Sequence, residues 1–185
     1  MTTRPRLLGI SGSLRKGSFC TAILRTAAEQ ISDRADFDIL ALDDVPLYNQ
    51  DLDSDAPPAE AVALRDSIGN ADGLLIATPE YNYGMSGVLK NALDWASRPA
   101  YKSVLKGKPV LIISNSPGAL GGARAQIQLR QTLFGTLSRV VARPEIAVAH
   151  VATKLTEGRL TDEQTRSHFK EGLADLAAEV ARTRS

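Results

Sequence analysis

Three short runs of this chain are apolar at almost every position, and they limit the possible folds more than any other feature. They read LLGI at residues 7–10, LLIA at 74–77 and VLII at 110–113. A strand that is apolar on both faces is buried on both faces, which is typical of a parallel sheet between two layers of helices. The runs therefore predict an α/β domain with a covered parallel sheet.

Longer segments with helical periodicity separate these runs, and two further strands complete the pattern. We expect strands at residues 7–10, 37–42, 73–78, 110–114 and 140–148. Five strands that alternate with five helices predict a flavodoxin-like, doubly wound α/β fold, with a five-stranded parallel sheet in the order 2-1-3-4-5. Because no long linker interrupts its 185 residues, the chain 1–185 is expected to form a single domain.

Apolar residues at helical spacing indicate which helix faces cover the sheet. Thr161 followed by Gln164 fits a capping box that opens the last helix, after a polar surface loop at 154–159. Leu89, Ala92 and Trp95 share a spacing that favours core packing over substrate contact. The stripes expected to pack on the sheet are Ile23, Leu24, Ala27, Ala28 and Ile31; Ile127, Leu133, Phe134 and Leu137; and Phe169, Leu173, Leu176, Ala177 and Val180.

The segment after the first strand is a candidate phosphate site. It reads SGSLRKGS at residues 11–18 and leads into a helical pattern, so hydroxyl groups, the guanidinium of Arg15 and N–H groups at a helix start would meet. The Lys before the Gly excludes a Walker loop, and the glycine spacing does not match GxGxxG. A mononucleotide phosphate is favoured, although Ser18 could simply cap the helix. The candidate hydroxyl groups are those of Ser11, Ser13 and Ser18.

Two further loops are expected at the same edge of the sheet, because they follow the third and fourth strands. They read TPEYNYGMSG at residues 78–87 and SNSPGALGG at 114–122. The aromatic side chains suit packing against a flat heteroaromatic ring, and the glycines allow the backbone to approach that ring closely. The alternative is that the tyrosines only anchor their loop on the sheet. The candidate ring-binding residues are Pro79, Glu80, Tyr81, Asn82, Tyr83 and Gly118.

Charge and cysteine usage narrow the class of protein. Lys and Arg total 22 against 21 Asp and Glu, a formal charge of +1, so we expect no nucleic-acid partner. No run approaches the roughly 20 apolar residues of a membrane span, and no metal-ligand set is apparent. The lone Cys20 excludes an internal disulfide, and the N-terminus lacks an apolar signal segment. These features favour a cytoplasmic protein.

Five motifs, in matching order, resemble the NADPH-dependent FMN reductase family, and especially its bacterial quinone and chromate reductases. The resemblance spans residues 7–145 and implies a flavodoxin-like fold with non-covalent FMN. It also implies two-electron, ping-pong transfer from NADPH or NADH to quinones, free flavin, azo compounds or metal oxyanions such as chromate. The motifs are GSLRKGSF at 12–19, PLYNQD at 46–51, TPEYNYG at 78–84, LKNALDW at 89–95 and GGARAQIQLRQ at 121–131.

The resemblance also implies roles for individual residues. Position 20 departs from the family, which commonly has Asn there, and the Cys20 thiol is only a weak donor. Cys20 is then either a small side chain that fills space or a redox-active thiol at a helix N-terminus. The implied phosphate contacts are Ser13, Arg15, Ser18, Phe19 and Cys20, and the implied flavin contacts are Glu80, Tyr81, Asn82, Tyr83 and Ser116.

The remaining expectations concern assembly and catalysis. Apolar groups on the loops at 46–52 and 78–87 have no further domain to cover them, which favours a homodimer or homotetramer with flavin near a subunit boundary. Arg124 and Arg130 belong either to a subunit contact or to a solvated helix face. No catalytic acid or base is expected, because the chemistry occurs on the flavin. An electron carrier, disfavoured by the balanced charge, and a redox-inert FMN-binding module remain alternative functions.

Overall fold

A single parallel sheet organises the molecule. The computed structural model describes residues 4–184. Its sheet has the strand order β2-β1-β3-β4-β5, with β6 also paired to β4, and this confirms the predicted flavodoxin-like order. The strands are β1 (Arg6–Ser11), β2 (Asp36–Leu40), β3 (Gly73–Pro79), β4 (Pro109–Asn115), β5 (Arg139–Val140) and β6 (Ile146–Val148).

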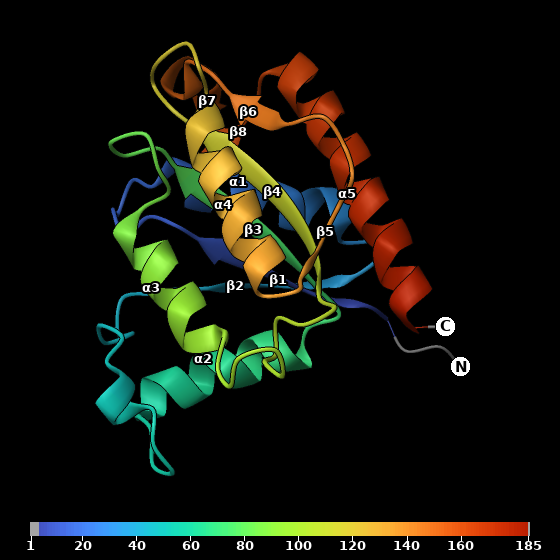
Figure 1. Ribbon diagram of the computed structural model, residues 1–185. Helices are drawn as coiled ribbons and strands as arrows, with labels where there is room; N and C mark the ends of the chain where they lie inside the picture. The colour runs from blue at the N-terminus through green and yellow to red at the C-terminus, as the bar shows by residue number, and fades with distance from the viewer. Residues whose placement is uncertain (1–3, 185) are drawn as a thin grey trace.

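Helices cover both faces of this sheet, as Figure 1 shows. Alternate side chains of the central strands pack into two separate cores, so Leu75 faces one helix layer and Ile76 the other. Within the described residues, no helix is both long and apolar enough to cross a membrane. One layer is α1 (Phe19–Ile31) with α5 (Glu163–Arg184), and the other is α2 (Ala59–Asn70), α3 (Gly87–Ala96) and α4 (Ala123–Gly135).

The predicted fifth strand at 140–148 is wrong as a continuous element. It is divided into β5 and β6, which both pair with β4. Pro144 lies between them and has no N–H to donate to a neighbouring strand. The adjacent Arg143 is nearly buried and donates from Nη1 to Asp175 Oδ2 at 2.9 Å. The segment between β5 and β6 therefore turns toward α5 instead of continuing the sheet.

The stripe predicted for α4 is confirmed only at Leu133, which is fully buried. Ile127 and Phe134 are 64% and 80% exposed, and Leu137 lies beyond the end of the helix. The buried side includes Gln126, whose Nε2 donates to Ser114 Oγ and Ile146 O at 2.9 Å each. A hydrogen-bonded amide thus occupies a core position that a count of apolar residues assigns to the surface.

The start of α5 differs from the prediction by one residue. Asp162 caps the helix, because its Oδ2 accepts from the Thr165 N–H at 3.0 Å, whereas the Thr161 hydroxyl donates to Lys154 O. The expected loop at 154–159 contains a short antiparallel hairpin that precedes this cap. The hairpin strands are β7 (Leu155–Thr156) and β8 (Arg159–Leu160).

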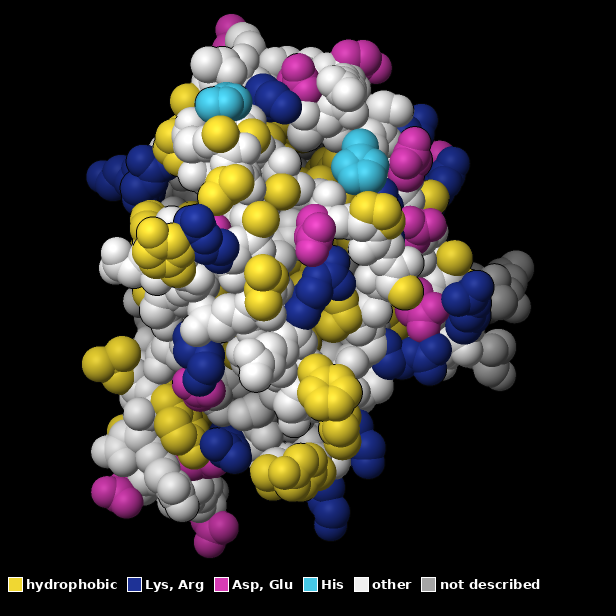
Figure 2. Space-filling view, turned by 45° about the horizontal axis from the view of Figure 1, so that its top comes forward, with side chains coloured by type: hydrophobic (Ala, Val, Ile, Leu, Met, Phe, Trp, Pro, Cys, Tyr) yellow, Lys and Arg dark blue, Asp and Glu magenta, His cyan; other side chains and the backbone are white. Residues whose placement is uncertain are grey.

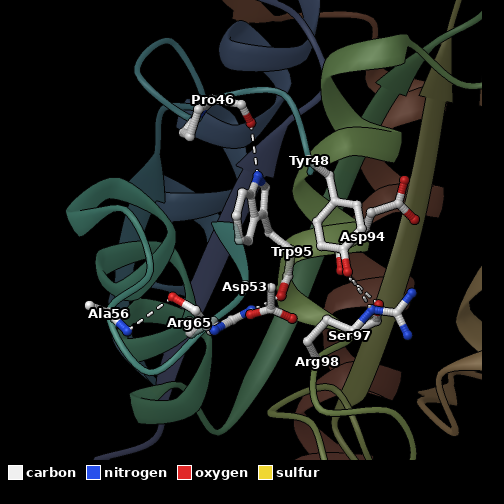
Figure 3. Close-up of polar contacts among 10 residues, drawn as sticks. Pro46, Tyr48, Asp53, Ala56, Arg65, Asp94, Trp95, Ser97 and Arg98 are labelled. Carbon is white, nitrogen blue, oxygen red and sulfur yellow. Dashed lines mark hydrogen bonds and ion pairs between the residues drawn. The ribbon is translucent and has the colours of Figure 1, made fainter. Parts of the chain in front are cut away.

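The segment after β2 is held against α3 by a set of polar contacts, of which Figure 3 shows the hydrogen bond from Trp95 to Pro46. Pro46 O accepts from Trp95 Nε1 and from Asn91 Nδ2, both at 2.8 Å. Asn91 Oδ1 accepts in turn from the Tyr48 N–H at 2.7 Å, and the Tyr48 and Trp95 rings meet edge to face. Trp95 is fully buried, so its predicted place in the core is confirmed.

Candidate functional site

Three loops meet at the carboxyl edge of the sheet: the β1 loop (12–18), the β3 loop (80–86) and the β4 loop (116–122). Gly12 joins the first two, since its N–H donates to Ala77 O at 2.8 Å and its carbonyl accepts from Ser86 Oγ at 2.6 Å. A Cβ at Gly12 would lie 3.1 Å from Ala77 O and from Pro79 Cδ. A side chain there would make tighter contacts than usual, so the neighbouring backbone would have to shift slightly to admit it.

The β1 loop presents a run of open backbone donors at the N-terminus of α1. Ser18 caps this helix, its Oγ accepting from the Thr21 N–H at 3.2 Å. From Ser13 to Cys20, no backbone N–H is used in a hydrogen bond to another described residue. The exposed Arg15 guanidinium lies 5.0 Å above the Phe19 ring centroid, at the same end of the helix. Open donors, helix polarity and a fixed cation together make a cradle for an anion.

A cavity of about 160 Å³ extends from this cradle toward the other two loops, and a shallower hollow of about 490 Å³ adjoins it. Ser13, Arg15 and Tyr81 line both, so the two spaces form one cleft. The cavity combines cationic, hydroxyl, aromatic and proline surfaces, as a phosphate with an attached ring would require. Its lining is Ser13, Arg15, Phe19, Cys20, Pro79, Glu80, Tyr81, Asn115, Ser116 and Pro117.

Most of the predicted site residues line this cavity, but several lie behind or beside it. The Ser11 hydroxyl is buried and bonds to Ser13 O and Thr21 Oγ1, at 3.2 and 3.1 Å. Ser18 is engaged as the helix cap, and Gly118 donates its N–H to Ser116 Oγ at 3.0 Å. These groups shape the loops from within rather than facing the cavity.

Asn82 and Tyr83 form the tip of the β3 loop and do not line the cavity. Both have positive φ, 48° and 67°, inside a turn closed by two hydrogen bonds between Tyr81 and Gly84. Tyr83 is 70% exposed, and the Arg124 guanidinium lies 4.2 Å from its ring centroid. This pair forms a rim beside the cleft.

The Glu80 carboxylate connects the β3 loop to α4. It accepts from the backbone N–H groups of Arg124 and Ala125, at 3.0 and 3.4 Å, and from Arg124 Nη1 at 3.4 Å. The N-cap of α4, Gly122, offers no side-chain acceptor of its own, so Glu80 caps the helix from a distant loop. Its carboxylate is therefore committed to positioning the loop.

Cys20 lies at the second position of α1 and is 1% exposed. Burial raises the pKa of its thiol from 9.0 to about 11. The hydrogen bond from Asn115 and the charge of Arg15 lower this pKa, but their effects are smaller than the effect of burial. The thiol is therefore protonated at neutral pH. This favours a space-filling side chain over an activated nucleophile.

The site includes residues that the sequence analysis did not single out, among them Pro117, which lines the cavity. Asn115 follows a buried strand directly, and its position at the ligand edge of the sheet was a usable signal. Ser86 joins two loops through Gly12, and Gln128 Oε1 accepts from the Met85 N–H at 2.7 Å. Their roles depend on contacts across the fold that local sequence does not reveal.

Comparison with known proteins agrees with this geometry. The profile of the NADPH-dependent FMN reductase family matches residues 5–153. The chain belongs to this family. It is 41% identical to the NAD(P)H-dependent FMN reductase of Pseudomonas aeruginosa over 97% of both chains. It is also 39% identical to the quinone reductase of Escherichia coli, in an alignment that covers 91% of this chain and 92% of that protein.

A solved structure extends the likeness to three dimensions. The NAD(P)H:acceptor oxidoreductase FerB of Paracoccus denitrificans superposes with a TM-score of 0.85 at 33% identity, over 96% of this chain and 98% of that one. The residues present here fit FMN, because the open donors of the β1 loop suit a terminal phosphate and the cavity leads from them to Tyr81. The chain is thus a flavin-dependent oxidoreductase of the FMN reductase family.

The raised pKa of Cys20 predicts a loss of stability at alkaline pH. A thiol with a pKa of 9.0 when unfolded and about 11 when folded contributes stability that is fully present below pH 9 and is lost as pH rises through about 11. In urea unfolding from neutral pH to about pH 11, the wild type should lose stability faster than Cys20→Ala. If the free energy of unfolding changed with pH in the same way for both proteins, the raised pKa of the Cys20 thiol would be contradicted.

Proposed function

We propose that this protein transfers two electrons from NADPH or NADH to a quinone through FMN bound in the cleft. The observation that carries the proposal is the run of open backbone donors beside Arg15, which continues into a cavity with an aromatic wall at Tyr81. Relatives at 39% and 42% identity are a quinone reductase of Escherichia coli and a 2-hydroxy-1,4-benzoquinone reductase of a Burkholderia species. Free flavin, azo compounds and chromate are further acceptors that the same open cleft would admit.

The residues of the cleft divide into two groups by the part of the cofactor that they would bind. Ser13, Arg15 and the N–H groups at the start of α1 bind the phosphate. The backbone of the β3 loop and Ser116 bind the ring edge, while Glu80 keeps that loop against α4. FMN held there would supply the redox chemistry, which is the two-electron transfer between the nicotinamide and the acceptor.

The proposed reaction uses no histidine of this chain as an acid or base. His168 lies on α5, and neither histidine lines the cavity. His150 comes closer than its sequence position indicates, because its N–H donates to Gly118 O at 3.2 Å. This contact uses the backbone and supports the β4 loop.

We further propose that the chain functions as one domain in the cytoplasm, since its helices cover one sheet and its free Cys20 is buried.

Replacing Arg15 should weaken FMN selectively. We expect Arg15→Ala to cost about 2 kcal/mol of binding, or about 30-fold in Kd, because a charge-assisted contact is lost. Lys16→Ala is the matched control, since Lys16 is an exposed cation of the same loop that does not line the cavity. Fluorescence titration of the apoprotein measures both. Equal affinities for wild type and Arg15→Ala would place Arg15 outside the site, and preferential binding of FAD would contradict the FMN assignment.

The kinetic pattern should be ping-pong, because one cleft must admit donor and acceptor in turn. Initial rates with NADPH and benzoquinone should give parallel double-reciprocal lines. Anaerobic NADPH or NADH should also bleach the flavin absorbance of the holoprotein. Intersecting lines would indicate a ternary complex instead. If FMN binds but neither nucleotide bleaches it, the protein is not a reductase, and the assignment becomes an electron carrier or a redox-inert FMN-binding module.

We also propose that the protein forms a homodimer or homotetramer. Ile127 and Phe134 lie seven residues apart on α4, and so share one outer face. Figure 2 shows hydrophobic side chains exposed among lysines and arginines on one side of the molecule. Large apolar groups on a helix surface are typical of a buried contact between copies. The same helix is attached to the β3 loop through Glu80, so this contact would lie close to the cleft.

Light scattering at micromolar concentration should therefore report at least a dimer. Phe134→Asp should shift the protein toward monomer, because a charge would be buried in the contact. Ala174→Asp, an exposed position on α5, should leave the mass unchanged. A wild-type monomer with full activity would contradict the proposed assembly.

A further inference from the structure

Asn115, the last residue of β4, is a buried amide with one free end. It is 2% exposed and lines the cavity. Its Nδ2 donates to Cys20 Sγ at 3.1 Å and lies 3.4 Å from Thr78 O. Because Nδ2 faces a backbone carbonyl, which can only accept, the orientation of the amide is fixed. No hydrogen bond to any described residue uses Asn115 Oδ1, which leaves an acceptor available to the cavity.

The neighbours of Asn115 place it between the two ends of the cleft. Cys20, on one side, belongs to the N-terminus of α1 and the anion cradle. Thr78, on the other, directly precedes the segment that lines the ring end of the cavity. Between the phosphate and the ring of FMN runs the ribityl chain, whose hydroxyl groups can donate hydrogen bonds. A carboxamide oxygen can accept from such a hydroxyl but cannot pair with a phosphate oxygen, which is itself an acceptor.

We infer that Asn115 Oδ1 accepts a hydrogen bond from a ribityl hydroxyl of the flavin. This inference rests on the proposed binding of FMN and assigns the middle section of the cleft. Cys20 and Thr78 hold the amide in place, so that Oδ1 is oriented before the ligand arrives. The buried Cys20 thiol then has a role as a protonated, compact acceptor that positions Asn115.

Three flavins that differ in their side chain test this assignment on the apoprotein. FMN and riboflavin carry the ribityl chain, whereas lumiflavin has only a methyl group in its place. In fluorescence titrations, Asn115→Leu should raise the Kd of FMN and of riboflavin about five- to tenfold, the effect of one lost hydrogen bond, and leave that of lumiflavin unchanged. Asn115→Ala should behave alike and is less demanding on packing.

Gln126→Leu is the matched control. Gln126 is also a buried amide with an unpartnered oxygen, and its Nε2 bonds to Ser114 Oγ, yet it does not line the cavity. It should lower thermal stability without changing any of the three Kd values. Equal weakening of all three flavins by Asn115→Leu, or no weakening of any, would overturn the assignment. A wild-type protein that binds no flavin would instead overturn the proposed function.

Discussion

The contact between Gly12 and the end of β3 is the constraint on which the site depends. Two hydrogen bonds, one to Ala77 O and one from Ser86 Oγ, hold the β1 loop against the β3 loop, which carries Tyr81. The parallel sheet places the ends of β1 and β3 side by side, and this close backbone approach holds their loops together at the edge of the cleft. The position of the cleft therefore depends on strand order and on a residue that lacks a Cβ.

The parts of the fold predicted from sequence are those fixed by local pattern. Continuous apolar runs identified the central strands, and the Ser- and Arg-rich segment after β1 identified the cradle, because burial and helix polarity act over a few residues. The errors fall where distant contacts prevail. Gln126 is buried because Ser114 and Ile146 accept its hydrogen bonds, and the segment that divides the last strand is held toward α5 by the contact from Arg143 to Asp175. Such partners lie far apart in sequence.

The motifs that carry the family resemblance do not all belong to the site. PLYNQD and LKNALDW meet each other through Pro46, Asn91 and Trp95, which attach the segment after β2 to α3. GSLRKGSF and TPEYNYG meet at the cleft instead. A motif can thus be characteristic of a family because it satisfies carbonyl and amide groups within the fold, without lining the cleft. Sequence alone does not distinguish these two reasons, whereas a contact map does.

Because of Glu80, α4 connects the wall of the cleft with the exposed apolar face proposed for self-association. Its carboxylate connects the N-terminus of the helix to the β3 loop, while the outer face of the same helix carries Ile127 and Phe134. If copies associate through that face, a shift of α4 on association also moves the wall of the cleft. Cofactor affinity and self-association would then be thermodynamically linked, each changing the other by the same factor. Dilution of the enzyme would then change its affinity for the cofactor without any change in the residues that line the cleft.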